Sequence, residues 1–170
     1  VDDTTGEYTV FVVGKITDSL NESQGFVGSD FSISNGSIYD RLAQTLQYDG
    51  SDSSFVSITR TIGTGNNTAK TATGLAQNTY YTISAVRGVS DIKIWLDGIV
   101  GDTTAISGTD QTLANPILVG TDRFLESEPP SLASSRLQGD IAEIIIYSAA
   151  LSDADRQTIE TYLRNKYATW

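Results

Sequence analysis

Two short runs near the middle of the chain alternate apolar and polar residues, and this alternation restricts the fold more than any other feature. The runs cover residues 79–86 and 91–96, and a four-residue loop containing a glycine joins them. Because successive side chains of a β-strand point to opposite faces, the pattern predicts an antiparallel hairpin with one buried face. The isoleucines, such as Ile83 and Ile94, mark the face that turns toward the core.

Similar short runs, rich in Val, Ile, Thr and aromatic residues, recur between turn residues along the chain. This rhythm is typical of an all-β protein built as an antiparallel sandwich or barrel. Further strands are expected at residues 8–15, 25–34, 41–47, 55–62, 99–100, 116–120 and 139–147. We interpret residues 63–67 as a turn, residues 101–112 as a polar loop and residues 122–138 as a long loop.

The last predicted strand, residues 139–147, is expected to be buried on both faces. Strict alternation would place Ile141, Glu143, Ile145 and Tyr147 on one face, opposite Ala142, Ile144 and Ile146.

The end of the chain changes period and predicts one helix, over about residues 152–167. Ser152 is the expected N-cap, and acidic residues follow it in the first turn. Ile159, Tyr162, Leu163 and Tyr167 then recur at helical spacing, which gives one apolar stripe for docking on the sandwich.

Composition excludes several classes of function. The chain of 170 residues has no Cys, His or Met, so thiol nucleophiles, imidazole bases and Cys/His zinc sites are ruled out. A formal net charge of -10 opposes binding to nucleic acid and to anionic membranes, and no apolar stretch approaches the roughly 20 residues that cross a bilayer. Since the chain opens on Val1, we expect a processed product or a fragment of a longer protein.

Several segments together resemble one known family. They are Trp95-Leu96-Asp97-Gly98 in the hairpin, residues 117–120, residues 137–147, the closing segment 150–167 and the early strand 8–16. On these residues the chain is similar to a laminin-G-like domain of the concanavalin A-like lectin/glucanase superfamily.

The resemblance implies a single domain over residues 1–170, folded as a jelly roll of two curved antiparallel sheets. It also implies binding of glycans or other surfaces, as in modular extracellular, bacterial and phage proteins. Members of the family usually carry preceding β-segments. We therefore expect either that such strands lie elsewhere in a longer chain or that a partner covers the sheet edge.

A glycan site would need an aromatic ring for the apolar side of a sugar and polar groups for its hydroxyls. The polar side of the hairpin and the loop after residue 120 offer such groups. The candidate ligand-binding residues are Tyr80, Lys93, Trp95, Asp97, Asp122 and Arg123. The alternative is that this side of the hairpin packs against the helix or a second sheet, and that Asp122 and Arg123 form a surface ion pair.

Calcium is the one cofactor that the residues suggest, because Ca²⁺ takes oxygen ligands from carboxylates and carbonyls on loops. Asp49 and Asp52, in the run Asp49-Gly50-Ser51-Asp52, are the candidate ligands. The alternative interpretation is an ordinary Asp-Gly turn.

Catalysis would have to rest on carboxylates. Retaining glycosidases need two carboxyl groups about 5 to 5.5 Å apart, but Glu143 has only isoleucines two positions away on either side. The sequence therefore favours a non-catalytic binding or adhesion module, with a polysaccharide hydrolase or lyase as the alternative. The expected partners are a glycan, a cell-surface or particle-surface protein, or other subunits of a larger assembly. The expected place is extracellular, on a cell surface or on a virion surface as a decoration or tail-fibre domain.

Overall fold

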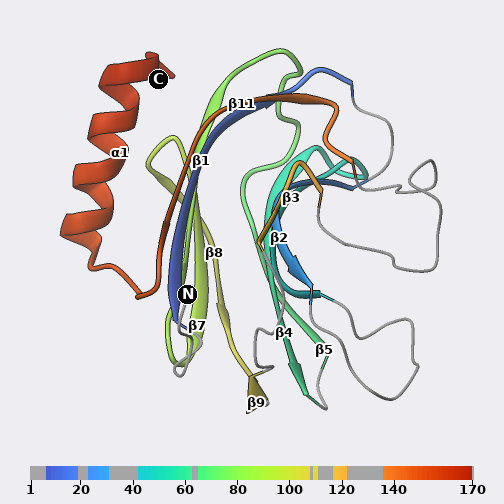
Figure 1. Cartoon of the computed structure of the whole chain (residues 1–170), viewed down its shortest axis with the longest axis vertical. Coiled ribbons are helices and arrows are strands. Elements are labelled where there is room, and N and C mark those ends of the chain that lie inside the picture. Colours follow the sequence, from blue (N-terminus) through green and yellow to red (C-terminus); the bar gives the residue numbers. More distant parts are fainter. Residues whose placement is uncertain are drawn as a thin grey trace.

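The computed structural model describes residues 7–18, 23–30, 42–62, 65–107, 109–110, 117–121 and 136–169. Within them, two antiparallel sheets pack face to face and a single helix covers the outer side of one sheet (Figure 1). The predicted all-β sandwich with a C-terminal helix is confirmed. Its elements are β1 (Tyr8–Ile16), β2 (Gln24–Asp30), β3 (Leu42–Asp49), β4 (Ser54–Ile62), β5 (Gly65–Lys70), β6 (Tyr81–Arg87), β7 (Asp91–Leu96), β8 (Ile99–Ala105), β9 (Thr109–Asp110), β10 (Ile117–Val119), β11 (Gly139–Tyr147) and α1 (Asp153–Tyr167).

The first sheet, called sheet A here, has the strand order β11-β1-β6-β7-β8. The predicted hairpin forms β6 and β7, with Ala85 opposite Ile94 in the register. A two-residue turn at Asp97 and Gly98 then leads into β8. Both turn residues have positive φ, of 50° and 77°, as tight hairpin turns require.

The second sheet, sheet B, has the order β10-β2-β3-β4-β5, and β9 pairs with β4 beside it. Its inner face carries a chain of aromatic rings that fill the space between the sheets. Phe55 lies at the centre of this chain, with ring centroids 5.6 Å from Phe26, 5.8 Å from Tyr48 and 5.8 Å from Tyr81 of sheet A. The edge-to-face arrangement suits the charge distribution of aromatic rings and fixes the spacing of the two sheets.

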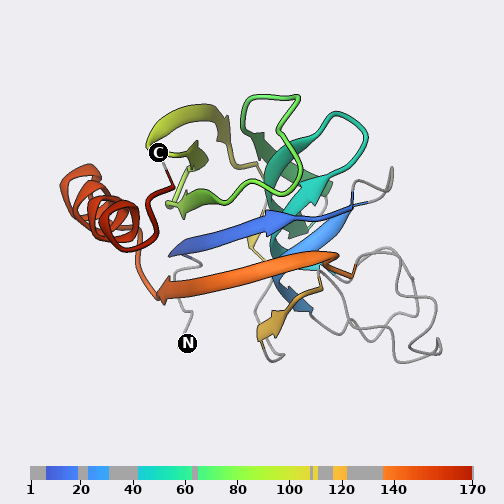
Figure 2. The same cartoon turned by 90° about the horizontal axis from the view of Figure 1, so that it is seen from above.

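Helix α1 lies on the outer face of sheet A, away from sheet B (Figures 1 and 2). Ser152 caps its N-terminus as predicted, because the Ser152 hydroxyl accepts a hydrogen bond from the Asp155 amide at 3.2 Å. Leu163 is the buried apolar residue of the helix and packs against Phe11 and Val13 of β1. No helix in the described part of the chain is long and apolar enough to cross a membrane.

Three strands occupy residues that the sequence led us to interpret as turn or loop. Residues 65–67 begin β5, residues 101–105 continue β8, and residues 109–110 form the short β9. Strands β5 and β8 are polar at these positions and lie at sheet edges, so they lack the apolar alternation that identifies a half-buried strand. Side chains bond across from one edge to the other: Thr104 donates to the Thr68 carbonyl at 2.7 Å.

A β-bulge corrects the predicted faces of β11. In the register with β1, Val13 pairs with Glu143, but the next residue, Gly14, pairs with Ile141. Ala142 is therefore the extra residue, and one extra residue reverses the alternation beyond it. Ile141 accordingly packs into the core between the sheets, while Ile145 packs under the helix.

Candidate ligand-binding surface

Trp95 is covered by the helix and offers no platform for a sugar. Only 6% of Trp95 is exposed, and the Arg156 guanidinium of α1 lies 4.0 Å from the ring centroid. The alternative that the polar side of the hairpin packs against the helix is therefore correct for this residue. Ser84, next to Trp95 in the register, likewise donates a hydrogen bond to Glu160 of α1.

Tyr80, the residue before β6, lies on the same outer face of sheet A and stays 37% exposed. The Lys15 ammonium of β1 lies 4.9 Å from the centroid of the Tyr80 ring. Lys15 is also paired with Asp140 of β11 at 2.9 Å, and the Tyr80 hydroxyl donates to the same carboxylate at 3.4 Å. A ring, an ammonium and a carboxylate thus meet where β1 and β11 pass the start of β6.

These contacts set the charge state of the cluster. The hydrogen bond from Lys15 holds the pKa of Asp140 below its usual value, and the same bond raises the pKa of Lys15. Both groups are therefore charged at neutral pH. The Asp140 carboxylate, with 56% of its side chain exposed, can accept hydrogen bonds from a ligand.

A second cluster of the same kind lies where α1 passes β11. The Lys166 ammonium bonds the Glu143 carboxylate at 3.1 Å and the Tyr162 hydroxyl at 2.9 Å. It also lies 5.3 Å and 5.2 Å from the ring centroids of Tyr162 and Tyr167. These partners raise the pKa of Lys166, with the bond to Tyr162 the largest cause. We call the surface that carries both clusters, on β1, β11 and α1, the helix-side surface.

The exposed aromatic side chains of the described residues all lie on the helix-side surface. They are Tyr80, Tyr162 and Tyr147, exposed by 37%, 48% and 38%. Tyr147, at the end of β11, packs edge-on against Phe11 beneath the helix, with ring centroids 6.3 Å apart. By contrast, the described tyrosine of sheet B, Tyr48, is buried in the core.

The other two hairpin candidates have structural contacts of their own. Lys93 forms an ion pair with Asp91 at 3.1 Å. Asp97 accepts a hydrogen bond from the Thr82 amide at 2.8 Å and so secures the end of the hairpin. Burial raises the pKa of Asp97 to about 6, although the bond from Thr82 acts in the opposite direction. Asp122 and Arg123 lie outside the described residues.

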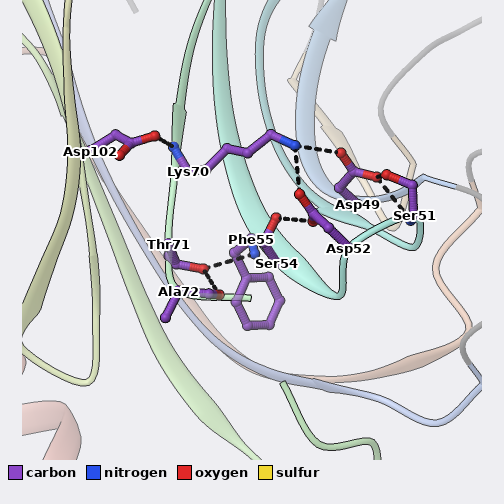
Figure 3. A network of polar contacts seen from close by, with 9 residues as sticks. All are labelled: Asp49, Ser51, Asp52, Ser54, Phe55, Lys70, Thr71, Ala72 and Asp102. Atoms are coloured by element: carbon purple, nitrogen blue, oxygen red, sulfur yellow. Dashed lines mark hydrogen bonds and ion pairs between the residues drawn. The ribbon is translucent and has the colours of Figure 1, made fainter. Parts of the chain in front are cut away.

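Asp49 and Asp52, the candidate calcium ligands, do come together at the end of sheet B. The cation between them is the Lys70 ammonium of β5, at 3.0 Å from Asp49 and 2.9 Å from Asp52 (Figure 3). Ser51 and Ser54 donate further hydrogen bonds to the two carboxylates, at 2.6 Å and 2.5 Å.

This network keeps both aspartates ionised. Burial pushes the pKa of Asp49 upward, but the bonds from Ser51 and Lys70 outweigh it and the pKa is lowered. The bonds from Ser54 and Lys70 lower the pKa of Asp52. A calcium ion would need the same oxygens that Lys70 occupies, and the described residues contain no group of three or more acidic, His or Cys side chains able to hold a metal.

Glu143, the residue weighed for catalysis, is the partner of Lys166 in the second cluster. Sequence reasoning placed Tyr80 on the face where it lies but did not find Lys15, Asp140 or Lys166. Lys15 and Asp140 are adjacent only through the pairing of the first and last strands. One feature of the sequence could have indicated Lys15: it is a polar residue at the end of a strand whose other residues are buried.

Comparison with known proteins gives a likeness in structure but not in sequence. No protein-family model matches the chain, and no curated protein matches it in sequence. A structure of the carbohydrate-binding CBM40 domain of the IT-sialidase of Ruminococcus gnavus is similar, with a TM-score of 0.72 and 14% identity over 93% of this chain and 84% of that one. A structure of that domain bound to α2,3-sialyllactose gives a TM-score of 0.71 and 15% identity over 91% of this chain and 82% of the other.

Two further structures extend the likeness. The native heptameric SAP-like pentraxin of Limulus polyphemus has a TM-score of 0.66 and 13% identity over 92% of this chain and 70% of that one. A sialidase of Trypanosoma rangeli has a TM-score of 0.64 and 11% identity, and here 95% of this chain spans only 23% of the other. At these identities the comparisons show the fold alone: a jelly-roll sandwich of two antiparallel sheets, which is the fold that the sequence resemblance implied.

Proposed function

We propose that this chain is a non-catalytic glycan-binding module of the laminin-G-like type, and that the helix-side surface is its binding site. The observation that carries the proposal is the gathering of the exposed tyrosines of the described residues on this one surface. Two of them, Tyr80 and Tyr162, adjoin an ammonium that is paired with a carboxylate. An aromatic ring beside charged hydrogen-bonding groups is the combination that holds a sugar, apolar side on the ring and hydroxyls on the charges.

The similarity to carbohydrate-binding CBM40 domains over most of both chains supports a binding role. Support for a non-catalytic role comes from the pairing of Glu143 with Lys166, which leaves this carboxylate as part of an ion pair. In this proposal the module belongs to a surface-exposed assembly, on a cell or a virion, and its net charge of -10 keeps that exposed surface well hydrated.

The test is a glycan array followed by calorimetry on the strongest binder, with the variants Tyr80→Ala and Tyr162→Ala. Removing a stacked ring is expected to weaken binding roughly tenfold, since an aromatic contact contributes on the order of 1 kcal/mol beyond its buried area. Val119→Ala is the matched control, because Val119 is exposed on the edge of sheet B, and it should leave the affinity unchanged.

Two results would contradict the proposal. If no glycan on the array binds, or if both tyrosine variants bind as well as the native chain, the helix-side surface is not a glycan site. If reducing sugar appears when the chain is incubated with β-glucan or alginate, and Glu143→Gln abolishes it, the alternative of a polysaccharide hydrolase or lyase is correct.

A further inference from the structure

All four lysines of the chain lie among the described residues, and each is already paired with a carboxylate. The nitrogen-to-oxygen distances fall between 2.9 and 3.1 Å. The pairs are Lys15 with Asp140, Lys70 with Asp49 and Asp52, Lys93 with Asp91, and Lys166 with Glu143. The lysine charges of this chain are therefore neutralised within the fold.

On the helix-side surface this pairing decides what kind of ligand the two clusters can hold. Lys15 and Lys166 supply two positive charges, and Asp140 and Glu143 supply two negative charges at 2.9 Å and 3.1 Å from them. A ligand carboxylate would have to displace one of these internal partners or lie beside it. The whole chain carries a net charge of -10, which adds long-range repulsion toward an anionic ligand.

A neutral sugar needs to displace neither carboxylate and is not repelled by the net charge. Ionised carboxylates only accept hydrogen bonds, so Asp140 and Glu143 suit ligands rich in hydroxyl donors. The phenol rings of Tyr80 and Tyr162 supply apolar surface beside each carboxylate. Nothing in this set of contacts requires the ligand to be charged.

The spacing of the two clusters sets the length of the ligand. Asp140 and Glu143 belong to one strand, β11, and are three residues apart on it. The bulge at Ala142 shortens this span, because Asp140 and Glu143 lie opposite Lys15 and Val13, which are two residues apart on β1. At about 3.3 Å per residue, the two carboxylates are therefore separated by roughly 6.6 Å along the sheet. This distance is similar to the length of one sugar unit, so neighbouring sugars of an oligosaccharide can each contact one cluster.

We propose, building on the glycan-binding function above, that the helix-side surface selects neutral oligosaccharides of two or more sugars over those that carry sialic or uronic acid. The selection comes from the internal ion pairs Lys15–Asp140 and Lys166–Glu143, which leave the ring and the acceptor oxygens as the groups that a ligand meets.

The first experiment compares matched neutral and acidic glycans on one array and then by calorimetry. The probes are lactose against α2,3-sialyllactose, and β-glucan oligomers against alginate oligomers. We expect the neutral member to bind about fivefold or more tightly, with a difference that shrinks at high salt, because salt screens repulsion between exposed charges. Disaccharides or longer oligomers should bind more tightly than the single sugar.

The second experiment releases the two lysines. The double variant Asp140→Asn with Glu143→Gln keeps the shapes of the side chains but removes both internal partners. It should shift the ratio of acidic to neutral binding toward the acidic member by up to about fivefold for each charge. The control is Asp49→Asn with Asp52→Asn, which changes the net charge by the same amount at the end of sheet B and should leave the ratio unchanged.

The outcomes separate this inference from the function on which it rests. If the acidic member of the pairs binds as tightly as the neutral one, and Tyr80→Ala weakens that binding, the chain binds glycans but the inference is wrong. If the control variant shifts the ratio as much as the helix-side variant does, overall charge and not the local ion pairs sets the selectivity, and the inference also fails. If no glycan binds at all, the proposed function and the inference fall together.

Discussion

The buried ion pair beneath α1 gives a sharp prediction for the variant Glu160→Gln. Glu160 accepts hydrogen bonds from Arg156, at 2.5 Å, and from Ser84 of β6, and both members of the ion pair are buried. Glutamine has nearly the same shape as glutamate but carries no charge. The substitution therefore leaves the Arg156 guanidinium buried without its closest counter-charge.

Breaking a buried pair in this way costs about 3 to 5 kcal/mol. Two contacts remain to moderate the loss: the stacking of Arg156 on Trp95 at 4.0 Å, and an exposed carboxylate, Asp153, 3.5 Å from the guanidinium. We expect a net loss of about 3 kcal/mol in the free energy of unfolding. A domain of this size has about 5 to 15 kcal/mol in total, so the melting temperature should fall by roughly 6 to 12 °C.

The assay is urea unfolding followed by tryptophan fluorescence in a Trp170→Phe background, where Trp95 is the single reporter. Because Trp95 is buried under the helix, its emission shifts to the red when α1 leaves the sheet. The control, Asp153→Asn, removes the exposed carboxylate near the same arginine and should cost less than about 1 kcal/mol.

A third variant checks the physical reason. Replacing both charges by apolar residues of similar size, as in Arg156→Met with Glu160→Leu, removes the uncompensated charge and should recover most of the lost stability. If the double variant is no more stable than Glu160→Gln, or if Glu160→Gln costs no more than the control, the buried pair is not what holds the helix in place.

Three further predictions follow from the fold. Burial raises the pKa of Asp97 from 3.8 to about 6 in the folded state, so the free energy of unfolding should fall as the pH rises from about 4 to 6. Asp97→Asn should remove this pH dependence from a stability curve measured by urea unfolding at several pH values. Gly101→Ala should cost about 1 to 3 kcal/mol in the same assay, since a Cβ at Gly101 would overlap the Lys70 carbonyl oxygen. Lys70→Met should leave Asp49 and Asp52 without their cation, and calcium should then raise the melting temperature of the variant more than that of the native chain in differential scanning calorimetry.

The elements whose apolar side chains recur at regular spacing could be predicted from the sequence. The β6–β7 hairpin and helix α1 appear within one or two residues of their expected ends, because alternation and capping are local signals. Strand β5 and residues 101–105 of β8 were not recognised because they are polar and lie at sheet edges, so no apolar alternation marks them. The bulge at Ala142 gives no signal in the sequence, since it exists only relative to β1.

The site shows the same division between local and distant signals. The face of Tyr80 followed from alternation, but whether a residue on that face is open or covered depends on where the helix docks, which buried Trp95 and left Tyr80 exposed. The ion pairs of Lys15 and Lys166 join residues 125 and 23 positions apart, in strands and a helix that meet only after folding. No pattern within a short window of sequence carries that information.

The position of β1 in sheet A has a consequence for how the chain is made. β1 is the first described strand, yet it lies between β6 and β11, and β11 is the last of the described strands along the chain. Until residues 139–147 have left the ribosome, one edge of β1 has no partner and part of the core stays open to water. Pairing across such a long sequence separation is slow. Sheet A therefore cannot close until β11 has been synthesised, and the cell must keep the unfinished β1 edge from pairing with other chains until then.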